Sequence, residues 1–199
     1  MRWLTGLAVL VLAACGATTA APQPVAHGAR AEAVFAGGCF WSMESDFEHL
    51  DGVIDAIDGY TGGHVDHPSY EDVATETTGH YESVRVIYDS SRLTYAQLLH
   101  YYWRHIDPTD SGGQFCDRGP SYRTAIFVTP AQRAEAEASK AETERVLGRA
   151  VDTRILPLAQ FWQAEAYHQN YARLHPVAYG AYRVGCRRDQ VVAAVWRGH

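Results

Sequence analysis

The chain has 199 residues, 47% hydrophobic and 20% charged, so it can bury one sizeable core and is not a disordered protein. A formal net charge of −6, without any cluster of Lys and Arg, argues against a protein that acts on nucleic acid or on anionic lipid headgroups. Four cysteines are too few for a disulfide scaffold, and their wide spacing disfavours a structural zinc site, which leaves catalytic or redox cysteines.

The first fourteen residues have the layout of a secretory signal. Arg2 gives a positive start, and residues 3–12 form an apolar run too short to span a bilayer comfortably. The run ends in Leu12-Ala13-Ala14-Cys15, which resembles the lipobox of bacterial lipoproteins, where cleavage precedes the cysteine and that cysteine carries the lipid. The alternative is ordinary cleavage between Thr18 and Ala21, where small residues also occur.

This layout predicts three parts of the chain: a signal peptide at 1–14, a lipidated N-terminus with a flexible Ala-, Pro- and Gly-rich tether at 15–31, and one catalytic domain at 32–199. We therefore expect an exported protein of the cell envelope or periplasm, attached to a membrane only through a lipid on Cys15.

The remaining sequence alternates between strand and helix patterns, with Thr94 and the Thr129–Gln132 capping box as helix starts. In chain order, the pattern predicts a strand at 33–36, a helix at 40–50, strands at 53–60 and 83–88, a helix at 94–106, a strand at 124–128, a helix to about 147, a strand at 151–156 and a short helix at 163–174. Residues 62–80 are predicted to form a long polar loop, and the chain after residue 174 is predicted to form an irregular tail. The order of elements predicts an α+β sheet with helices packed on one face.

Cys39 stands directly after Gly37-Gly38, at the start of a predicted helix. Unpaired backbone N–H groups and the helix dipole favour negative charge there, so the position predicts a thiolate. The alternative is a small buried core residue. Phe40 and Trp41 could form an apolar wall for a small nonpolar substrate group, or could belong to the core.

Three segments carry a family resemblance: Gly37-Gly38-Cys39-Phe40-Trp41, Thr78-Gly79-His80-Tyr81-Glu82-Ser83-Val84 and Tyr122-Arg123-Thr124-Ala125-Ile126. They resemble the signature segments of the A-type peptide methionine sulfoxide reductases. The match runs colinearly from about Glu32 to the end of the chain and includes Phe161, Trp162, Glu165, Tyr167, His168 and Gln169. It implies an α+β fold with a ferredoxin-like core, and reduction of methionine S-sulfoxide, free or in proteins, to methionine.

Reduction of a sulfoxide needs a soft nucleophile for the sulfur and a proton for the oxygen. The resemblance makes Cys39 the nucleophile, which becomes a sulfenic acid, and Glu82 the acid. Glu82 would need burial to stay protonated near neutral pH. The resemblance also implies hydrogen bonds from Tyr70 and Tyr122 to the sulfoxide oxygen, a place for Asp117 in the same pocket, and contacts of the substrate methyl group with Phe40 and Trp41.

A cysteine sulfenic acid must condense with another thiol before the enzyme can turn over. Cys186, in a Gly-rich and mobile tail at 179–185, resembles the family's recycling cysteine, and Cys116, beside Asp117, is the competitor. Ser42 is a departure, because relatives commonly carry Gly or Cys there. The resemblance implies a thioredoxin-like dithiol as electron donor and no metal, flavin or nucleotide cofactor.

Three other hypotheses compete with the methionine sulfoxide reductase hypothesis. His64 and His67 have a suggestive metal-ligand spacing, but exposed loop histidines are the simpler interpretation. A cysteine hydrolase would use Cys39 with His80 or His168 as base, and would leave Glu82 unexplained. A non-enzymatic envelope lipoprotein would carry an unreactive Cys39.

Overall fold

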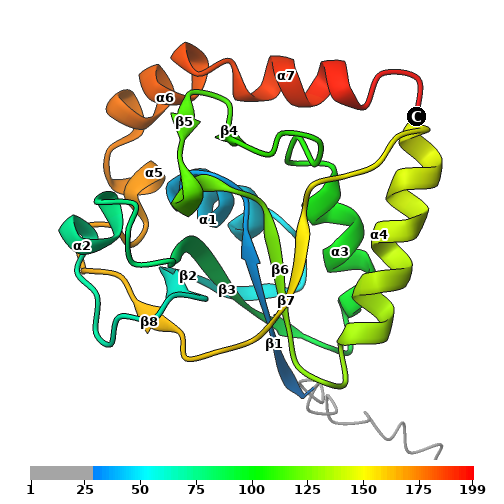
Figure 1. Cartoon of the computed structure of the whole chain (residues 1–199), viewed down its shortest axis with the longest axis horizontal. Coiled ribbons are helices and arrows are strands. Elements are labelled where there is room, and N and C mark those ends of the chain that lie inside the picture. Colours follow the sequence, from blue (N-terminus) through cyan, green and yellow to red (C-terminus); the bar gives the residue numbers. More distant parts are fainter. Residues whose placement is uncertain (1–28) are drawn as a thin grey trace, which may run out of the picture.

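The computed structural model describes residues 29–199 and is built around a six-stranded sheet of order β7-β6-β1-β3-β2-β8 (Figure 1). The strands of this sheet are β1 (Arg30–Ala36), β2 (Val53–Thr61), β3 (Tyr81–Asp89), β6 (Ala125–Val128), β7 (Arg154–Pro157) and β8 (Trp162–Gln163). A separate hairpin consists of β4 (Gly113–Gln114) and β5 (Asp117–Arg118). The helices are α1 (Phe40–Glu48), α2 (Tyr70–Ala74), α3 (Tyr95–Trp103), the 3-10 turn η1 (Pro120–Tyr122), α4 (Arg133–Leu147), α5 (Tyr171–Leu174), α6 (Pro176–Gly185) and α7 (Arg188–Val195).

The predictions for residues 1–28, which include the signal, the lipidation site Cys15 and most of the tether, lie outside the described residues. β1 begins at Arg30, two residues before the expected start of the domain. Among residues 29–199, no helix is both long and apolar enough to cross a bilayer.

The four central strands have the split βαβ arrangement of a ferredoxin-like core. β3 lies between β1 and β2 and is antiparallel to both, while β6 pairs antiparallel with β1 on its other side. β7 extends one edge in parallel with β6, and β8 extends the other edge in antiparallel with β2. The predicted fold class, a mixed sheet with packed helices, is confirmed.

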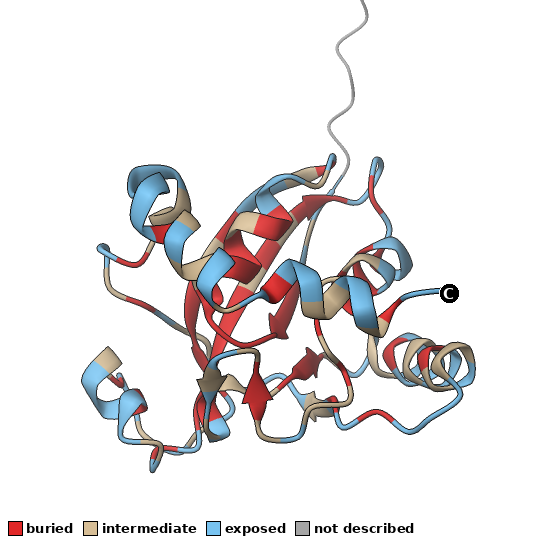
Figure 2. Cartoon of the chain, turned by 90° about the horizontal axis from the view of Figure 1, so that it is seen from above, coloured by how far each residue is buried: buried red, intermediate tan, exposed pale blue. Residues whose placement is uncertain are grey.

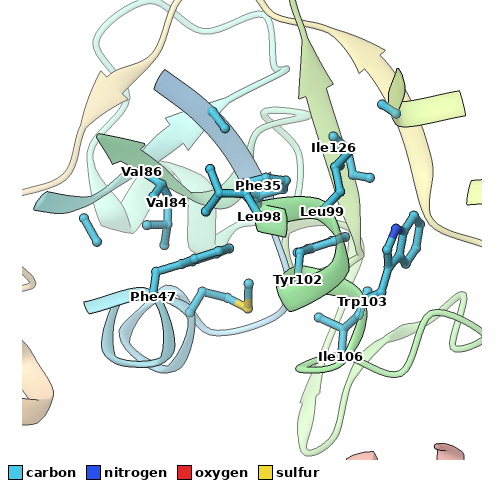
Figure 3. Packing of buried hydrophobic residues seen from close by; sticks show 14 of the residues in the cluster. Phe35, Phe47, Val84, Val86, Leu98, Leu99, Tyr102, Trp103, Ile106 and Ile126 are labelled. Atoms are coloured by element: carbon cyan, nitrogen blue, oxygen red, sulfur yellow. The ribbon is translucent and has the colours of Figure 1, made fainter. Parts of the chain in front are cut away.

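The sheet separates two apolar clusters because successive residues of a strand point to opposite faces. Ala33 and Phe35 of β1 join the main core, and Val34 and Ala36 join the smaller cluster behind the sheet. In the main core, α1 and α3 pack on the sheet, and the Phe35 ring stacks on Phe47 at 5.2 Å between centroids (Figure 3). The four central strands β1, β2, β3 and β6 are buried along most of their length, and the helices expose their outer faces (Figure 2).

The C-terminal third differs from the sequence expectation. Only residues 171–174 of the expected helix at 163–174 are helical, and its first residue, Gln163, pairs with Gly59 of β2 in strand β8. The expected irregular tail is wrong, since α6 and α7 occupy most of it. Pro176 at the start of α6 is pre-organised for a first helical turn, and ion pairing of Arg183 with Asp46 at 2.8 Å holds this helix on α1. Two more elements, α2 and the β4–β5 hairpin, form in segments expected to be loop.

The register of the sheet brings the ends of three strands together. Phe35 pairs with Val84 and Ala36 with Ala125, so the end of β1 lies beside the starts of β3 and β6. The Tyr102 hydroxyl of α3 fixes this junction by hydrogen bonds to the carbonyls of Ala36 at 2.8 Å and Ala125 at 3.3 Å. The segments that follow β1 and precede β3 and β6 must therefore meet at one edge of the sheet.

Candidate active site

Cys39 lies at this edge, between β1 and α1. The chain reaches it through Gly38, whose φ of +83° favours glycine, and a Cβ atom there would lie only 2.6 Å from the Cβ of buried Gln114. The Cys39 carbonyl accepts the Ser42 N–H of α1 at 3.1 Å. Cys39 is the one free cysteine of residues 29–199, and its side chain is buried.

Glu82, near the start of β3, meets the first turn of α1. Its Oε2 accepts the backbone N–H of Phe40 at 3.0 Å, and its side chain is 3% exposed. Burial raises the pKa of Glu82 to about 8, although the Phe40 N–H and the Tyr122 hydroxyl both favour the ionised form. The burial that a proton donor requires near neutral pH is therefore present.

The expectation of a lowered Cys39 pKa is wrong for this structure. Burial raises the pKa of the Cys39 thiol well above its usual range, and nearby Glu82 adds to the effect, against an opposing hydrogen bond from Tyr182. The physical reason lies in the helix N-terminus: the Phe40 N–H points to the carboxyl of Glu82, and the sulfur makes no capping hydrogen bond. Near neutral pH, the neutral form of the Cys39 thiol is thus favoured, beside a Glu82 carboxyl that is mostly protonated.

Two phenols border the Glu82 carboxyl, as expected. Tyr122 comes from η1, just before β6, and interacts with both Glu82 and Tyr70 by side-chain hydrogen bonds. Tyr70 is the first residue of α2, where its backbone N–H donates to Glu165 Oε1 at 2.8 Å. Burial and the charge of Glu82 raise the pKa of Tyr70 and Tyr122, so both remain hydrogen-bond donors.

Asp117, on β5, reaches the site through a residue that the sequence reasoning missed. The Tyr182 hydroxyl of α6 donates to Asp117 Oδ2 and also forms a hydrogen bond with Cys39. Burial raises the pKa of Asp117. Tyr182 precedes Cys186 by four residues, which is one helical turn, and this spacing could have revealed it had the tail been recognised as a helix.

Phe40 and Trp41, the two residues expected to form an apolar wall, differ in how far they are buried. Phe40 is 1% exposed and packs against Tyr60 in the core, whereas Trp41 is only partly buried. Trp41 stacks on Tyr171 at 3.7 Å between ring centroids, and its Nε1–H donates to His168 Nδ1 at 3.1 Å. Trp41 is therefore the ring that can meet a substrate, and Phe40 supports it from behind.

The four histidines considered as a base or as metal ligands are not arranged for either role in the described part of the chain. His80 Nδ1 accepts the Gly63 N–H and its Nε2 bonds the Val65 carbonyl at 2.7 Å, while His168 Nδ1 is taken by Trp41. No hydrogen bond of either ring goes to Cys39, so the cysteine hydrolase reading is not supported. His64 and His67 are exposed, and neither belongs to a group of potential ligand atoms within residues 29–199.

The other two cysteines of the folded domain are joined to each other. Cys116, in the exposed turn of the β4–β5 hairpin, forms a disulfide with the half-buried Cys186 at the end of α6. Cys186 is therefore not bonded to Cys39 in this state. The pairing brings the two candidates for the resolving thiol into contact, with the Tyr182–Asp117 hydrogen bond beside them.

A buried free thiol, a buried carboxyl and a nearby disulfide at one sheet edge are typical of a thiol-dependent oxidoreductase. The family model of peptide methionine sulfoxide reductase matches residues 31–199, and the chain belongs to this family. It is similar to peptide methionine sulfoxide reductase MsrA 2 of Caulobacter vibrioides, with 52% identity over the full length of both chains.

Solved structures agree with this assignment. Reduced Mxr1 of Saccharomyces cerevisiae superposes with a TM-score of 0.71 at 30% identity, over 74% of this chain and 87% of that one. Mxr1 in complex with Trx2 gives 0.52 at 25% identity, over 78% and 91%. The protein is an enzyme that reduces methionine sulfoxide to methionine and so repairs oxidised proteins, and a non-enzymatic role is not supported.

The raised pKa of Glu82 predicts a pH-dependent stability. Between pH 4.5, where an ordinary Glu ionises, and about 8, the folded state keeps a proton that the unfolded state loses, so the free energy of unfolding falls as pH rises. Glu82→Gln removes this dependence. In urea unfolding, the variant should gain stability relative to the wild type from pH 5 to 8 and no further above 9.

Glu44→Gln is the matched control. Glu44 is also buried, with a pKa raised to about 7, so the gain from its replacement should level off about one pH unit earlier. A stability difference for Glu82→Gln that stays constant from pH 5 to 9 would show that Glu82 is ionised throughout.

Proposed function

We propose that Cys39 attacks the sulfur of methionine S-sulfoxide while Glu82 protonates the departing oxygen. The observation that carries this proposal is the shared anchor of the two groups: Cys39 ends the turn before α1, and the next backbone N–H, that of Phe40, holds the Glu82 carboxyl. The acid and the nucleophile are thereby fixed at the same helix terminus. Positioning of this kind supplies much of the rate of a bimolecular reaction.

The protonation states fit the reaction without net proton uptake. Glu82 gives its proton to the sulfoxide oxygen, and the Cys39 thiol, as it becomes a nucleophile, returns a proton to Glu82. Attack forms a bond between the Cys39 sulfur and the sulfoxide sulfur, and the protonated oxygen of the substrate leaves as water. A water molecule then attacks the Cys39 sulfur and breaks the bond between the two sulfurs. The cysteine sulfur loses two electrons to the sulfoxide sulfur, which leaves a sulfenic acid and methionine.

Substrate orientation follows from three groups around a pyramidal sulfur. Tyr70 and Tyr122 donate to the oxygen, Trp41 with Phe40 behind it contacts the methyl group, and Cys39 defines the line of attack. With three directions fixed, the methionine side chain of only one epimer can leave toward solvent. Asp117 takes part indirectly, by orienting the Tyr182 hydroxyl that hydrogen-bonds the Cys39 sulfur.

Single-turnover reduction of the separate epimers of a blocked methionine sulfoxide tests this chemistry. The wild type should consume the S epimer only. Cys39→Ser should abolish the reaction, and Glu82→Gln should slow it by about 10²- to 10⁴-fold, because general acid catalysis contributes that much. Reduction of the R epimer, or an unchanged rate in Glu82→Gln, would refute the proposed roles.

Recycling is proposed to pass outward through the two remaining thiols. Cys186 attacks the Cys39 sulfenic acid, which releases water and forms a Cys39–Cys186 disulfide. Cys116 then attacks Cys186 and frees Cys39, which gives the Cys116–Cys186 disulfide present in the structure. The hydrogen bond between Tyr182, one turn before Cys186, and Cys39 supports this order. A thioredoxin-like dithiol completes the cycle at exposed Cys116, in line with the Mxr1–Trx2 complex.

Disulfide mapping by mass spectrometry after one turnover without reductant checks the order of the thiols. The wild type should yield Cys116–Cys186. Cys116→Ser should stop at Cys39–Cys186, and Cys186→Ser should leave a Cys39 sulfenic acid that a dione reagent can trap. A Cys39–Cys116 disulfide in Cys186→Ser would instead make Cys116 the resolving thiol.

We also propose that the enzyme is exported and lipid-anchored through Cys15, where it repairs envelope proteins. The lipobox-like Leu12-Ala13-Ala14-Cys15 at the end of the apolar run supports this. Expressed in a bacterium with a fatty-acid label, the wild type should carry label and sediment with membranes, and Cys15→Ser should do neither. A mature N-terminus between Thr18 and Ala21 would refute the anchor but not the export.

A further inference from the structure

Arg188, the first residue of α7, is the largest fully buried side chain of the described fold, at 2% exposure. It follows Cys186 by two residues. Its Nη1 donates to the Gly37 carbonyl at 3.2 Å, and its Nη2 donates to the His105 carbonyl at 2.9 Å and to the Met43 sulfur at 3.0 Å. A guanidinium loses its hydration on burial, so each of these acceptors offsets part of a large desolvation cost.

The same guanidinium also reaches the hairpin that carries Cys116. It lies 4.7 Å from the centre of the Phe115 ring, the neighbour of Cys116, in a cation–π contact. Its Nε is 3.6 Å from Asp46 Oδ2, which supplies a countercharge. One side chain therefore contacts the segments of all three cysteines: Gly37 two residues before Cys39, Phe115 beside Cys116, and its own backbone two residues after Cys186.

We propose that Arg188 is a positioning residue for recycling, which holds the three cysteine segments at the mutual distance that thiol exchange needs. The inference rests on the cysteine order proposed above. Thiol–disulfide exchange requires the attacking thiolate to approach a particular sulfur of the disulfide, so a displacement of about 1 Å can cost about 10²-fold in rate.

The sulfoxide-reducing half of the site has supports that do not involve Arg188. Tyr102 binds the Ala36 carbonyl, and Glu82 holds the Phe40 N–H. The segment between α6 and α7 is different. α7 is also anchored by the ion pair of Asp189 with Arg183 of α6 and, at its far end, by Trp196, whose Nε1 donates to the Ile106 carbonyl at 3.4 Å. Arg188 is its buried link to the catalytic turn. Loss of Arg188 should therefore slow recycling more than sulfoxide reduction.

The test compares two rates in the reduced full-length enzyme during one turnover with methionine S-sulfoxide: formation of methionine, and formation of the Cys116–Cys186 disulfide. In Arg188→Met, methionine formation should stay within about threefold of the wild type while disulfide formation slows at least about tenfold, since misplacement affects the exchange steps. Arg188→Lys should recover part of the loss, because it restores a cation and a donor.

Arg104→Gln is the matched control. Arg104 also holds the C-terminal segment, by a hydrogen bond from Nη1 to the His199 carbonyl at 3.1 Å and a cation–π contact with Trp196, and both contacts lie at the far end of α7. Both of its rates should stay near those of the wild type. Should Arg188→Met fail to fold, Arg188→Lys keeps a cation beside Asp46 and should still slow disulfide formation more than methionine formation.

Equal slowing of both rates in Arg188→Met would show that Arg188 has only a structural role and would overturn the inference. An unchanged rate of disulfide formation would also overturn it. Failure of the proposed function has a separate signature, namely no methionine formed by the wild type in the same assay.

Discussion

The hydrogen bond from the Phe40 N–H to Glu82 is the interaction on which the site depends. A helix N-terminus offers unpaired donors, and here a carboxyl from the adjacent strand, rather than the cysteine sulfur, takes the first one. This choice fixes the acid beside the nucleophile, satisfies a buried polar group, and leaves the Cys39 thiol without the stabilisation that would make it a permanent thiolate.

The surroundings reinforce this state through burial rather than through countercharges. Asp58 lies beneath the site with 0% exposure, and neither of its carboxyl oxygens has a hydrogen-bond partner among the described residues. Its pKa is raised well above the usual range by burial, with Glu44 and Glu82 as further causes. Burial thus favours the protonated, uncharged form of Asp58, Glu44 and Glu82 together. An uncharged, weakly hydrated site suits a neutral sulfoxide and lets one proton move between Glu82 and oxygen.

The sequence was sufficient where local patterns and strand order decide the outcome. The main strands and the helices α1, α3 and α4 follow their periodicity, whereas α2 and the β4–β5 hairpin were not expected. The ferredoxin-like core that the resemblance implied, with which the predicted strand order is compatible, brings the end of β1 beside the starts of β3 and β6 and so unites Cys39, Glu82 and Tyr122. The sequence also predicted that Thr94 caps α3, and its Oγ1 accepts the Gln97 N–H. Such features depend on contacts close in sequence or repeated along a ladder.

The structure of the C-terminal segment could not be predicted from local sequence patterns, because it depends on single long-range contacts. The helical period of α6 is obscured by glycine and aromatic residues, and ion pairing with Asp46 holds it in place. The cation–π contact of Arg188 with Phe115 and the Cys116–Cys186 disulfide each join residues about seventy positions apart. The raised pKa of Cys39 could not be predicted from the sequence either. The helix N-terminus predicts stabilisation of a thiolate, whereas the burial that opposes it is known only from the fold.

The proposed reaction gives separate tasks to the buried site at the sheet edge and to the C-terminal segment that carries Cys186. A nucleophile that reduces a sulfoxide benefits from exclusion of water, but a buried sulfenic acid is out of reach for a protein reductant. The cysteines resolve this conflict by their exposure, which rises from buried Cys39 through half-buried Cys186 to exposed Cys116. The proposed recycling requires the helical segment that carries Cys186 to stay attached to the catalytic turn, and the hydrogen bond from Arg188 to the Gly37 carbonyl makes such an attachment within the core. The buried guanidinium thus links the chemistry of the sheet edge to the reductant at the surface.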